Sequence, residues 1–133
     1  MSLSRFLQPA GWVRPSGYSN GVLAQGRQVF IAGQVGWNPQ SGKFESADLV
    51  EQVGQALRNV LAVLAQAAGR PEHVARMTWY LTSRAEYVAH LKEIGAAYRQ
   101  VMGKHFPAMT AVEVTALVEA QAKVEIEATA VIP

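Results

Sequence analysis

From Asp48 onward the sequence repeats apolar residues every three or four positions, which is the spacing of one face of an amphipathic helix. The repeating residues are Leu49, Val53, Ala56, Leu57, Val60, Leu61, Leu64 and Ala68. Asp48 and Glu51 have the spacing of a capping box, and Gly69 followed by Pro71 is typical of a helix end. The pattern therefore predicts a helix between Asp48 and Gly69 that must bury one face against another layer.

The residues after this helix change to a period of two and then return to a helical period. Between Val74 and Leu81 apolar and polar residues alternate, which predicts a strand with one polar face. Ser83 and Glu86 repeat the capping-box spacing, and apolar residues at helical spacing continue until Gly103. A second amphipathic helix is therefore predicted between Ser83 and Gly103.

Short strands are predicted towards both ends of the chain. Val22–Ala24 and Val29–Ala32 are separated by a turn at Gly26, a spacing that predicts a hairpin. Two further alternating stretches, Thr110–Leu117 and Ala122–Val131, predict strands near the C-terminus. The predicted order of elements is β-β-α-β-α-β-β.

These elements fit a single α+β domain over residues 1–133. Each helix has one apolar face and the strands alternate, so both requirements are met if the two helices pack on one face of a mixed sheet. The final strands carry residues of mixed character on both faces. A sheet face of this kind in a small domain is often covered by another copy of the chain. We therefore expect a homo-oligomer.

Composition excludes several classes of function. The sequence has no cysteine, a single aspartate and three isolated histidines, so we expect no disulfide and no metal site. The chain has twelve basic and ten acidic residues, and the basic residues are dispersed along it. Nucleic acid is therefore not an expected partner. No apolar run is long enough to span a bilayer, and the N-terminus lacks a signal-peptide pattern. We expect no membrane association and a cytoplasmic location.

Glu125 and Glu127 are the carboxylates most suggestive of chemistry. Because they lie two positions apart in a predicted strand, both side chains point to the same face, yet they alternate with apolar residues. A partly desolvated carboxylate can exchange protons with a bound water or substrate. An edge strand that shows its charges to solvent would give the same pattern. The pattern alone leaves both interpretations open.

Several segments of the chain together resemble the RidA (YjgF/UK114) family. The resemblance is carried by Phe106–Val114 and Val124–Val131, and upstream by Tyr18–Val22, Phe30–Val35, Asn38-Pro39 and Gly42. It covers nearly the whole chain from about Pro15 onward. Membership implies a chorismate-mutase-like α+β fold and three subunits whose sheets form a central barrel. It also implies small-molecule ligands bound in clefts between neighbouring subunits.

The resemblance also implies a chemistry and the residues that perform it. The best known members hydrolyse enamines and imines released by pyridoxal-phosphate enzymes, and they use no cofactor. By this resemblance Glu125 positions and activates the water, Tyr18 is the tyrosine of the pocket, and the backbone of Gly33 meets the ligand. Such a hydrolysis needs a held electrophile, an oriented water and a group that moves protons.

The sequence departs from the family pattern at three positions that the resemblance places in the pocket. Met109 stands where the deaminases carry an arginine that binds the substrate carboxylate through paired hydrogen bonds. Gly95 and Ala111 replace an asparagine and a cysteine found in some members. These departures predict a more apolar pocket and a substrate other than the usual 2-imino acid. The alternatives are a trimer that binds a small molecule without catalysis, and a ribonuclease, which the dispersed charge supports little.

Overall fold

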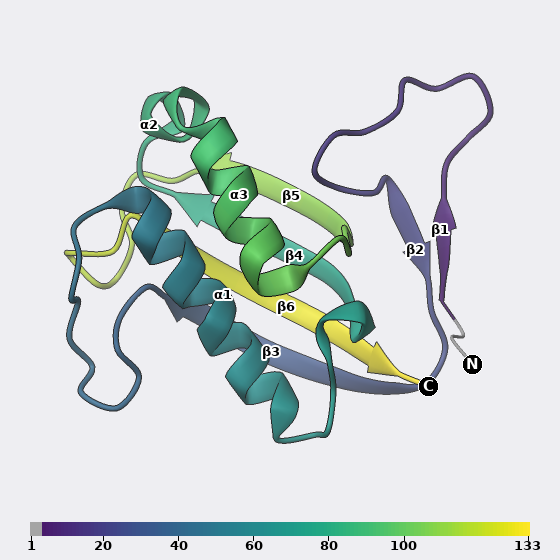
Figure 1. Cartoon of the computed structure of the whole chain (residues 1–133), viewed down its shortest axis with the longest axis horizontal. Helices are drawn as coiled ribbons and strands as arrows, with labels where there is room; N and C mark the ends of the chain where they lie inside the picture. Colours follow the sequence, from purple (N-terminus) through teal and green to yellow (C-terminus); the bar gives the residue numbers. More distant parts are fainter. Residues whose placement is uncertain (1–3) are drawn as a thin grey trace.

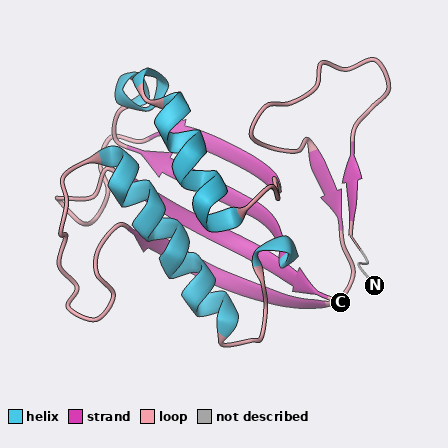
Figure 2. Cartoon of the chain, in the orientation of Figure 1, coloured by secondary structure: helices cyan, strands magenta, loops and turns pink. Residues whose placement is uncertain are grey.

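The computed structural model describes residues 4–133 and contains a four-stranded sheet, a helical layer and a separate two-stranded ribbon (Figures 1 and 2). In chain order the elements are β1 (Arg5–Leu7), β2 (Gly21–Leu23), β3 (Arg27–Val35), α1 (Leu49–Ala65), a 3-10 turn (Pro71–His73), β4 (Val74–Leu81), α2 (Arg84–Ala89), α3 (Leu91–Met102), β5 (Ala108–Glu113) and β6 (Val124–Ile132). The α+β class is confirmed.

The sheet is mixed, as predicted, and its strand order is β3-β6-β4-β5. Strand β6 pairs antiparallel with both β3 and β4, whereas β4 and β5 are parallel. The parallel pair requires a long crossover, which α2 and α3 provide. As a result, β3 and β5 form the two opposite edges of the sheet.

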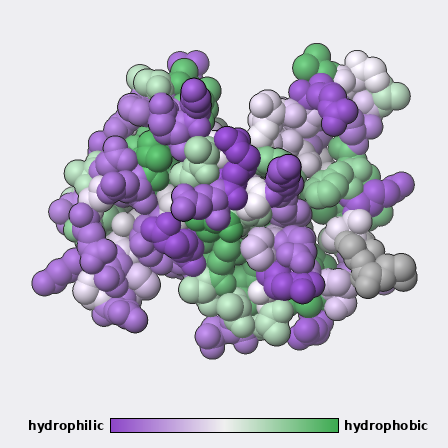
Figure 3. All heavy atoms as spheres, in the orientation of Figure 1, coloured by the Kyte–Doolittle hydropathy of each residue, from purple (hydrophilic) through white to green (hydrophobic). Residues whose placement is uncertain are grey.

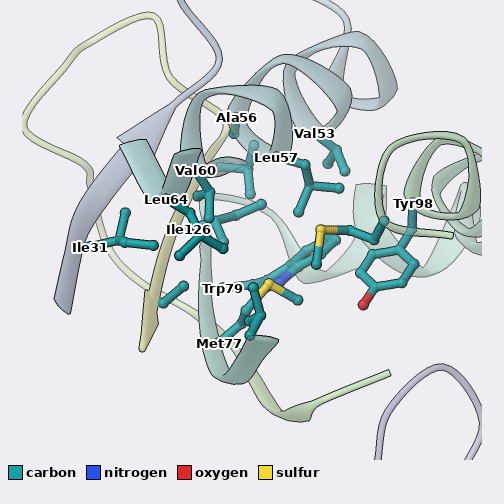
Figure 4. Close-up of a cluster of buried hydrophobic side chains, with 14 of the residues drawn as sticks. Ile31, Val53, Ala56, Leu57, Val60, Leu64, Met77, Trp79, Tyr98 and Ile126 are labelled. Carbon is teal, nitrogen blue, oxygen red and sulfur yellow. The ribbon is translucent and has the colours of Figure 1, made fainter. Parts of the chain in front are cut away.

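Helices α1 and α3 lie on the same face of the sheet, and the hydrophobic core lies between them and the strands (Figures 1 and 4). Alternate residues of β6 are buried in this core, and Trp79 of β4 and Leu57 of α1 are fully covered there. The predicted cap is present, since an Asp48 side-chain oxygen accepts a hydrogen bond from the Glu51 backbone N–H at 3.0 Å. Figure 3 shows that hydrophilic residues cover much of this helix-bearing side.

The opposite sheet face is open and of mixed character. It carries the other residues of β6, including Glu125 and Glu127, beside Tyr80 of β4. Phe30 of β3 is 74% exposed there, and Val112 of β5 is also exposed. An aromatic ring left in water beside carboxylates marks this face as a candidate contact surface.

The predicted hairpin near the N-terminus is wrong. Strand β2 pairs with β1, which the sequence did not predict, and the two form a ribbon beside the main sheet (Figure 1). Strand β3 instead pairs with β6. Gly26 has a φ of +150° and passes so close to the C-terminus that a Cβ would lie 2.7 Å from the carbonyl carbon of Ile132. The glycine therefore redirects the chain and does not close a hairpin.

Two further boundaries differ from the prediction. The second helix is divided into α2 and α3 because His90 has a φ of −122°, and its Nδ1 lies 2.8 Å from the carbonyl oxygen of Glu86. Strand β5 begins at Ala108 and ends at Glu113, so the second half of the predicted Thr110–Leu117 strand is loop. The alternation continues past the point where β4, the partner strand, ends at Leu81. Pairing therefore sets the length of β5.

Candidate functional site

Glu125 lies directly over the backbone of Gly33, so the structure brings these two predicted site residues together. The register between β3 and β6 shifts between Ile31 and Gln34, which places a bulge at Ala32 and Gly33. A Cβ at Gly33 would lie 2.8 Å from Cδ of Glu125, and closer still to one carboxylate oxygen. The carboxylate therefore occupies the space that any other residue at position 33 would fill.

Glu125 and Glu127 share the open face but differ in their hydrogen bonding. The Tyr80 hydroxyl donates to a Glu127 oxygen at 2.6 Å, and this bond is the main reason that the pKa of Tyr80 is raised above 10.0. Within residues 4–133 the half-buried carboxylate of Glu125 has no hydrogen-bond or ion-pair partner. Its lone pairs are therefore available to a water molecule or a ligand.

Met109 lies in a different place, in a largely apolar pocket between α3 and the start of β5. This pocket has a volume of about 460 Å³, and Gly95 and Trp79 line it together with Phe106. Met109 is half-buried and packs against the edge of the hydrophobic core. Most of the residues that line this pocket are aromatic or aliphatic.

The loop that carries Tyr18 is tied to the same strand. The backbone N–H of Ser19 donates to the carbonyl oxygen of Pro107 at 3.0 Å, and Ser19 also forms a parallel bridge with Ala108. Ser16 and Gly17 of this loop line the pocket that contains Met109, whereas Tyr18 itself is 38% exposed in the adjoining hollow. The loop therefore brings Tyr18 to the β5 edge.

Ala111 is exposed on β5, two residues after Met109, and is paired with Trp79 of β4. The predicted site residues therefore form two groups at different edges of the sheet. Glu125 and Gly33 lie at the β3–β6 side, whereas Met109 and its neighbours lie at the β5 edge. A single chain does not bring the two groups into one cleft.

One side chain near these groups, Arg99, was not predicted to bear on the site, and it lines the Met109 pocket from α3. Tyr80, on the open face, donates a hydrogen bond to Glu127. Arg99 follows Gly95 by four positions, which places both on one helix face, so this spacing was the available signal. Within residues 4–133 no group of three or more acidic or histidine side chains is placed to hold a metal ion. No helix in the same range is long and apolar enough to cross a membrane.

The mixed sheet and the helices on one face define an α+β protein with its candidate site at the sheet edges, in agreement with the chorismate-mutase-like fold that the family resemblance implies. Comparison with known proteins narrows this class. The chain belongs to the endoribonuclease L-PSP family, also called RidA or YjgF/UK114, whose family model matches residues 13–132.

Relatives and solved structures agree with this assignment. The human protein named 2-iminobutanoate/2-iminopropanoate deaminase is 32% identical over 114 residues, covering 86% of this chain and 79% of that protein. The goat (Capra hircus) protein of that name is 35% identical with the same coverage. A crystal structure of the Rid family protein YyfB from Yersinia pestis has a TM-score of 0.85 and 33% identity, covering 98% of this chain and 99% of that one. The YjgF gene product from E. coli has a TM-score of 0.70 and 29% identity, with 87% of each chain covered.

Proposed function

We propose that this protein is a RidA-like hydrolase that acts on an enamine, an imine or a related small C–N compound in a cleft between subunits. The observation that carries the proposal is the carboxylate of Glu125, half-buried against the bare backbone of Gly33 and without a partner in residues 4–133. The deaminase names of the relatives support the same class of reaction.

In the proposed reaction Glu125 takes a proton from a water molecule as the water oxygen bonds to the imine carbon. The proton passes to the imine nitrogen, which gives a carbinolamine. A second proton transfer from the hydroxyl to the nitrogen then accompanies cleavage of the C–N bond. The products are a carbonyl compound and ammonia, so one water molecule is consumed and Glu125 is regenerated.

We propose that the active form is a homotrimer, because the two groups of site residues lie at opposite sides of the sheet. If the β5 edge of one copy meets the β3 side of the next, Met109 and Glu125 line one cleft. Such a head-to-tail contact forms a closed ring when its rotation closes, and the family resemblance favours a ring of three. The ring of Phe30, which is exposed in the single chain, is then buried between subunits. Light scattering should give the mass of a trimer at micromolar concentration, and a stable monomer would contradict the cleft.

The substrate is proposed to differ from the usual 2-imino acids because Met109 cannot form the paired hydrogen bonds of an arginine. A thioether wall favours an apolar group at this point. The pocket around Met109 is formed mainly by aromatic and aliphatic residues, which supports this part of the proposal.

The test is a coupled assay in which a pyridoxal-phosphate enzyme generates imines of varied side chain and a semicarbazide trap measures the imine that remains. Glu125→Gln should lower kcat/KM by about a hundredfold or more, since general-base catalysis contributes about 10²–10⁴-fold. Glu127→Gln is the matched control, because it makes the same change on the same strand face two residues away. If both variants hydrolyse every imine as fast as the wild type, Glu125 is not the base. If the wild type accelerates none of them, the binding trimer without catalysis is the better description.

A further inference from the structure

The pocket that contains Met109 holds one charged side chain among its described lining residues, Arg99 of α3. A Cβ at Gly95, one helical turn earlier, would lie 3.3 Å from Nη1 of Arg99. The guanidinium therefore extends along the helix over the position where a larger residue would stand. Both residues line the same pocket as Met109.

The other polar groups of this pocket cannot offer a charge. Burial raises the pKa of Tyr87 and of Tyr98 above 10.0, so both phenols are neutral near pH 7. The indole Nε1–H of Trp79 has no hydrogen-bond partner in the described part of the chain, but it is fully covered and a ligand cannot reach it. Figure 4 shows Trp79 and Tyr98 among the buried side chains of the core.

Arg99, by contrast, is exposed and accessible, and within residues 4–133 its guanidinium has neither an ion pair nor a hydrogen bond. A guanidinium presents several fixed donors, which match the geometry of a carboxylate. An apolar pocket with such a donor group at its mouth fits a small anion that has a carboxylate at one end and an apolar group at the other.

We propose that Arg99 binds the carboxylate of the substrate while the apolar part of the substrate lies against Met109. This inference rests on the proposed function, because it assigns the specificity of the same cleft. The anchoring charge then comes from helix α3 and not from strand β5. The preferred substrate is then an imino acid that differs in shape from the usual 2-imino acids, because its carboxylate must reach the helix side of the pocket.

Helix α1 offers a matched control at Arg58. A Cβ at Gly54 would also lie 3.3 Å from Nη1 of Arg58, so the two helices share the same glycine–arginine spacing. Arg58, however, donates to the Gln55 side-chain oxygen at 3.0 Å and lies in a hollow without aromatic walls. Arg58→Gln therefore removes an equal charge from a comparable helix position outside the Met109 pocket.

The experiment measures the binding of 2-oxobutanoate, a keto acid, and of uncharged 2-butanone to the intact protein by NMR titration. We expect 2-oxobutanoate to bind about tenfold more weakly to Arg99→Gln than to the wild type, since a hydrogen bond to a charged group is worth at least about that factor. Arg58→Gln should bind it as the wild type does. The affinity of Arg99→Lys should lie between those of the wild type and Arg99→Gln, because lysine keeps the charge and loses the paired geometry. Binding of 2-butanone should be weak and equal in all variants.

Three results would overturn the role of Arg99: equal affinity of wild type and Arg99→Gln for 2-oxobutanoate, equal affinity of the wild type for both probes, or no measurable binding of 2-oxobutanoate. A change of mass of Arg99→Gln in light scattering would also overturn it, because the arginine would then act at a subunit contact. Binding does not depend on turnover. If Arg99→Gln loses binding and no variant hydrolyses an imine, the proposed hydrolase activity is therefore wrong, whereas the proposed binding of the carboxylate by Arg99 is supported.

Discussion

The two groups of candidate site residues are built in different ways. At the β3–β6 side, Glu125 is held by paired strands and by a bulge whose backbone it touches at Gly33. At the β5 edge, the pocket is shaped by side chains of a helix and a loop, and its charged group is the flexible arm of Arg99. In the first group the carboxylate fills the space beside the Gly33 backbone, whereas the second group consists of side chains that can adapt. Reactivity should therefore be sensitive to small changes at the first group, and substrate choice should be adjustable at the second.

The largest effect is expected from Gly33→Ala, which tests whether the geometry at Glu125 is fixed. The added Cβ would lie 2.8 Å from Cδ and 2.9 Å from Cγ of Glu125, so the carboxylate would have to leave its position over the backbone. A displacement of about 1 Å can lower a rate by about a hundredfold, so kcat should fall by about that factor. The measurement is kcat in the coupled imine assay, with circular dichroism to check the fold.

Gly95→Ala is the matched change at the second group. Its Cβ would meet only the end of the Arg99 side chain, which can shift, and alanine is the better helix former by about 1 kcal/mol. We expect a much smaller change in kcat than for Gly33→Ala, together with a gain in stability. Equal losses of kcat in the two variants would remove the contrast between a fixed and an adaptable group.

Met109→Arg should produce the next largest effect, a gain of about tenfold in kcat/KM for short imino acids such as the imine of 2-oxopropanoate. The new guanidinium can bind a carboxylate from β5, and such a contact is worth about 1.5–3 kcal/mol. Because Arg99 lines the same pocket, repulsion between the two cations limits the gain. The double variant Met109→Arg with Arg99→Gln should therefore gain more than the single one. No gain in either variant would show that the position of the cation does not select the substrate.

The sequence predicted those parts of the fold that repeat a local period. The pattern of α1, the capping spacing at Asp48 and the alternation of β4 and β6 each depend on neighbouring residues, and all are confirmed. The pairing of β1 with β2 was missed because each has three residues, too few for a period to be visible. Pairing between distant strands also decided where β5 ends.

The candidate site was predictable only in part. The approach of Glu125 to Gly33 agrees with the residues that the family resemblance singled out. Arg99 was missed because its spacing from Gly95 places it on a helix face but does not show which strand that face meets, and its place beside Met109 depends on how α3 packs against β5. The division of the site between two sheet edges could not be derived from the sequence, because strand order is a property of the tertiary fold.

A smaller effect is expected from Ser19→Ala, which loosens the loop at the β5 edge. The Ser19 hydroxyl donates to the carbonyl oxygen of Phe106, and loss of one such bond costs about 1 kcal/mol. The melting temperature should fall by about 3 °C, and KM should rise while kcat stays near the wild-type value. Ser41→Ala is the control, because Ser41 accepts a bond from the nearby Lys43 N–H in an exposed turn. A fall in kcat without a change in KM would contradict an adaptable second group.

The smallest expected effect is on the free energy of unfolding and its dependence on pH. It concerns two tyrosines, one in each region. The hydrogen bond to Glu127 raises the pKa of Tyr80 on the open face, and burial raises the pKa of Tyr98 beside the Met109 pocket. Both phenols bind their proton more tightly in the folded chain than in the unfolded chain, where the pKa is near 10.0. Their contribution to stability is therefore complete below pH 10 and is lost as the pH rises towards the folded pKa.

The free energy of unfolding can be measured in urea between about pH 8 and pH 11. These two groups should not change it below about pH 10, and above that pH they should make it decline. The Tyr98→Phe protein should be less stable at every pH, because the carbonyl oxygen of His105 loses its donor, but its decline above pH 10 should be shallower. Tyr80→Phe should make the decline shallower without exposing a buried carbonyl. Because Tyr98 is buried and Tyr80 is at the surface, added salt should reduce only the Tyr80 contribution. An equal salt effect on both tyrosines would show that the pocket is as open to solvent as the sheet face.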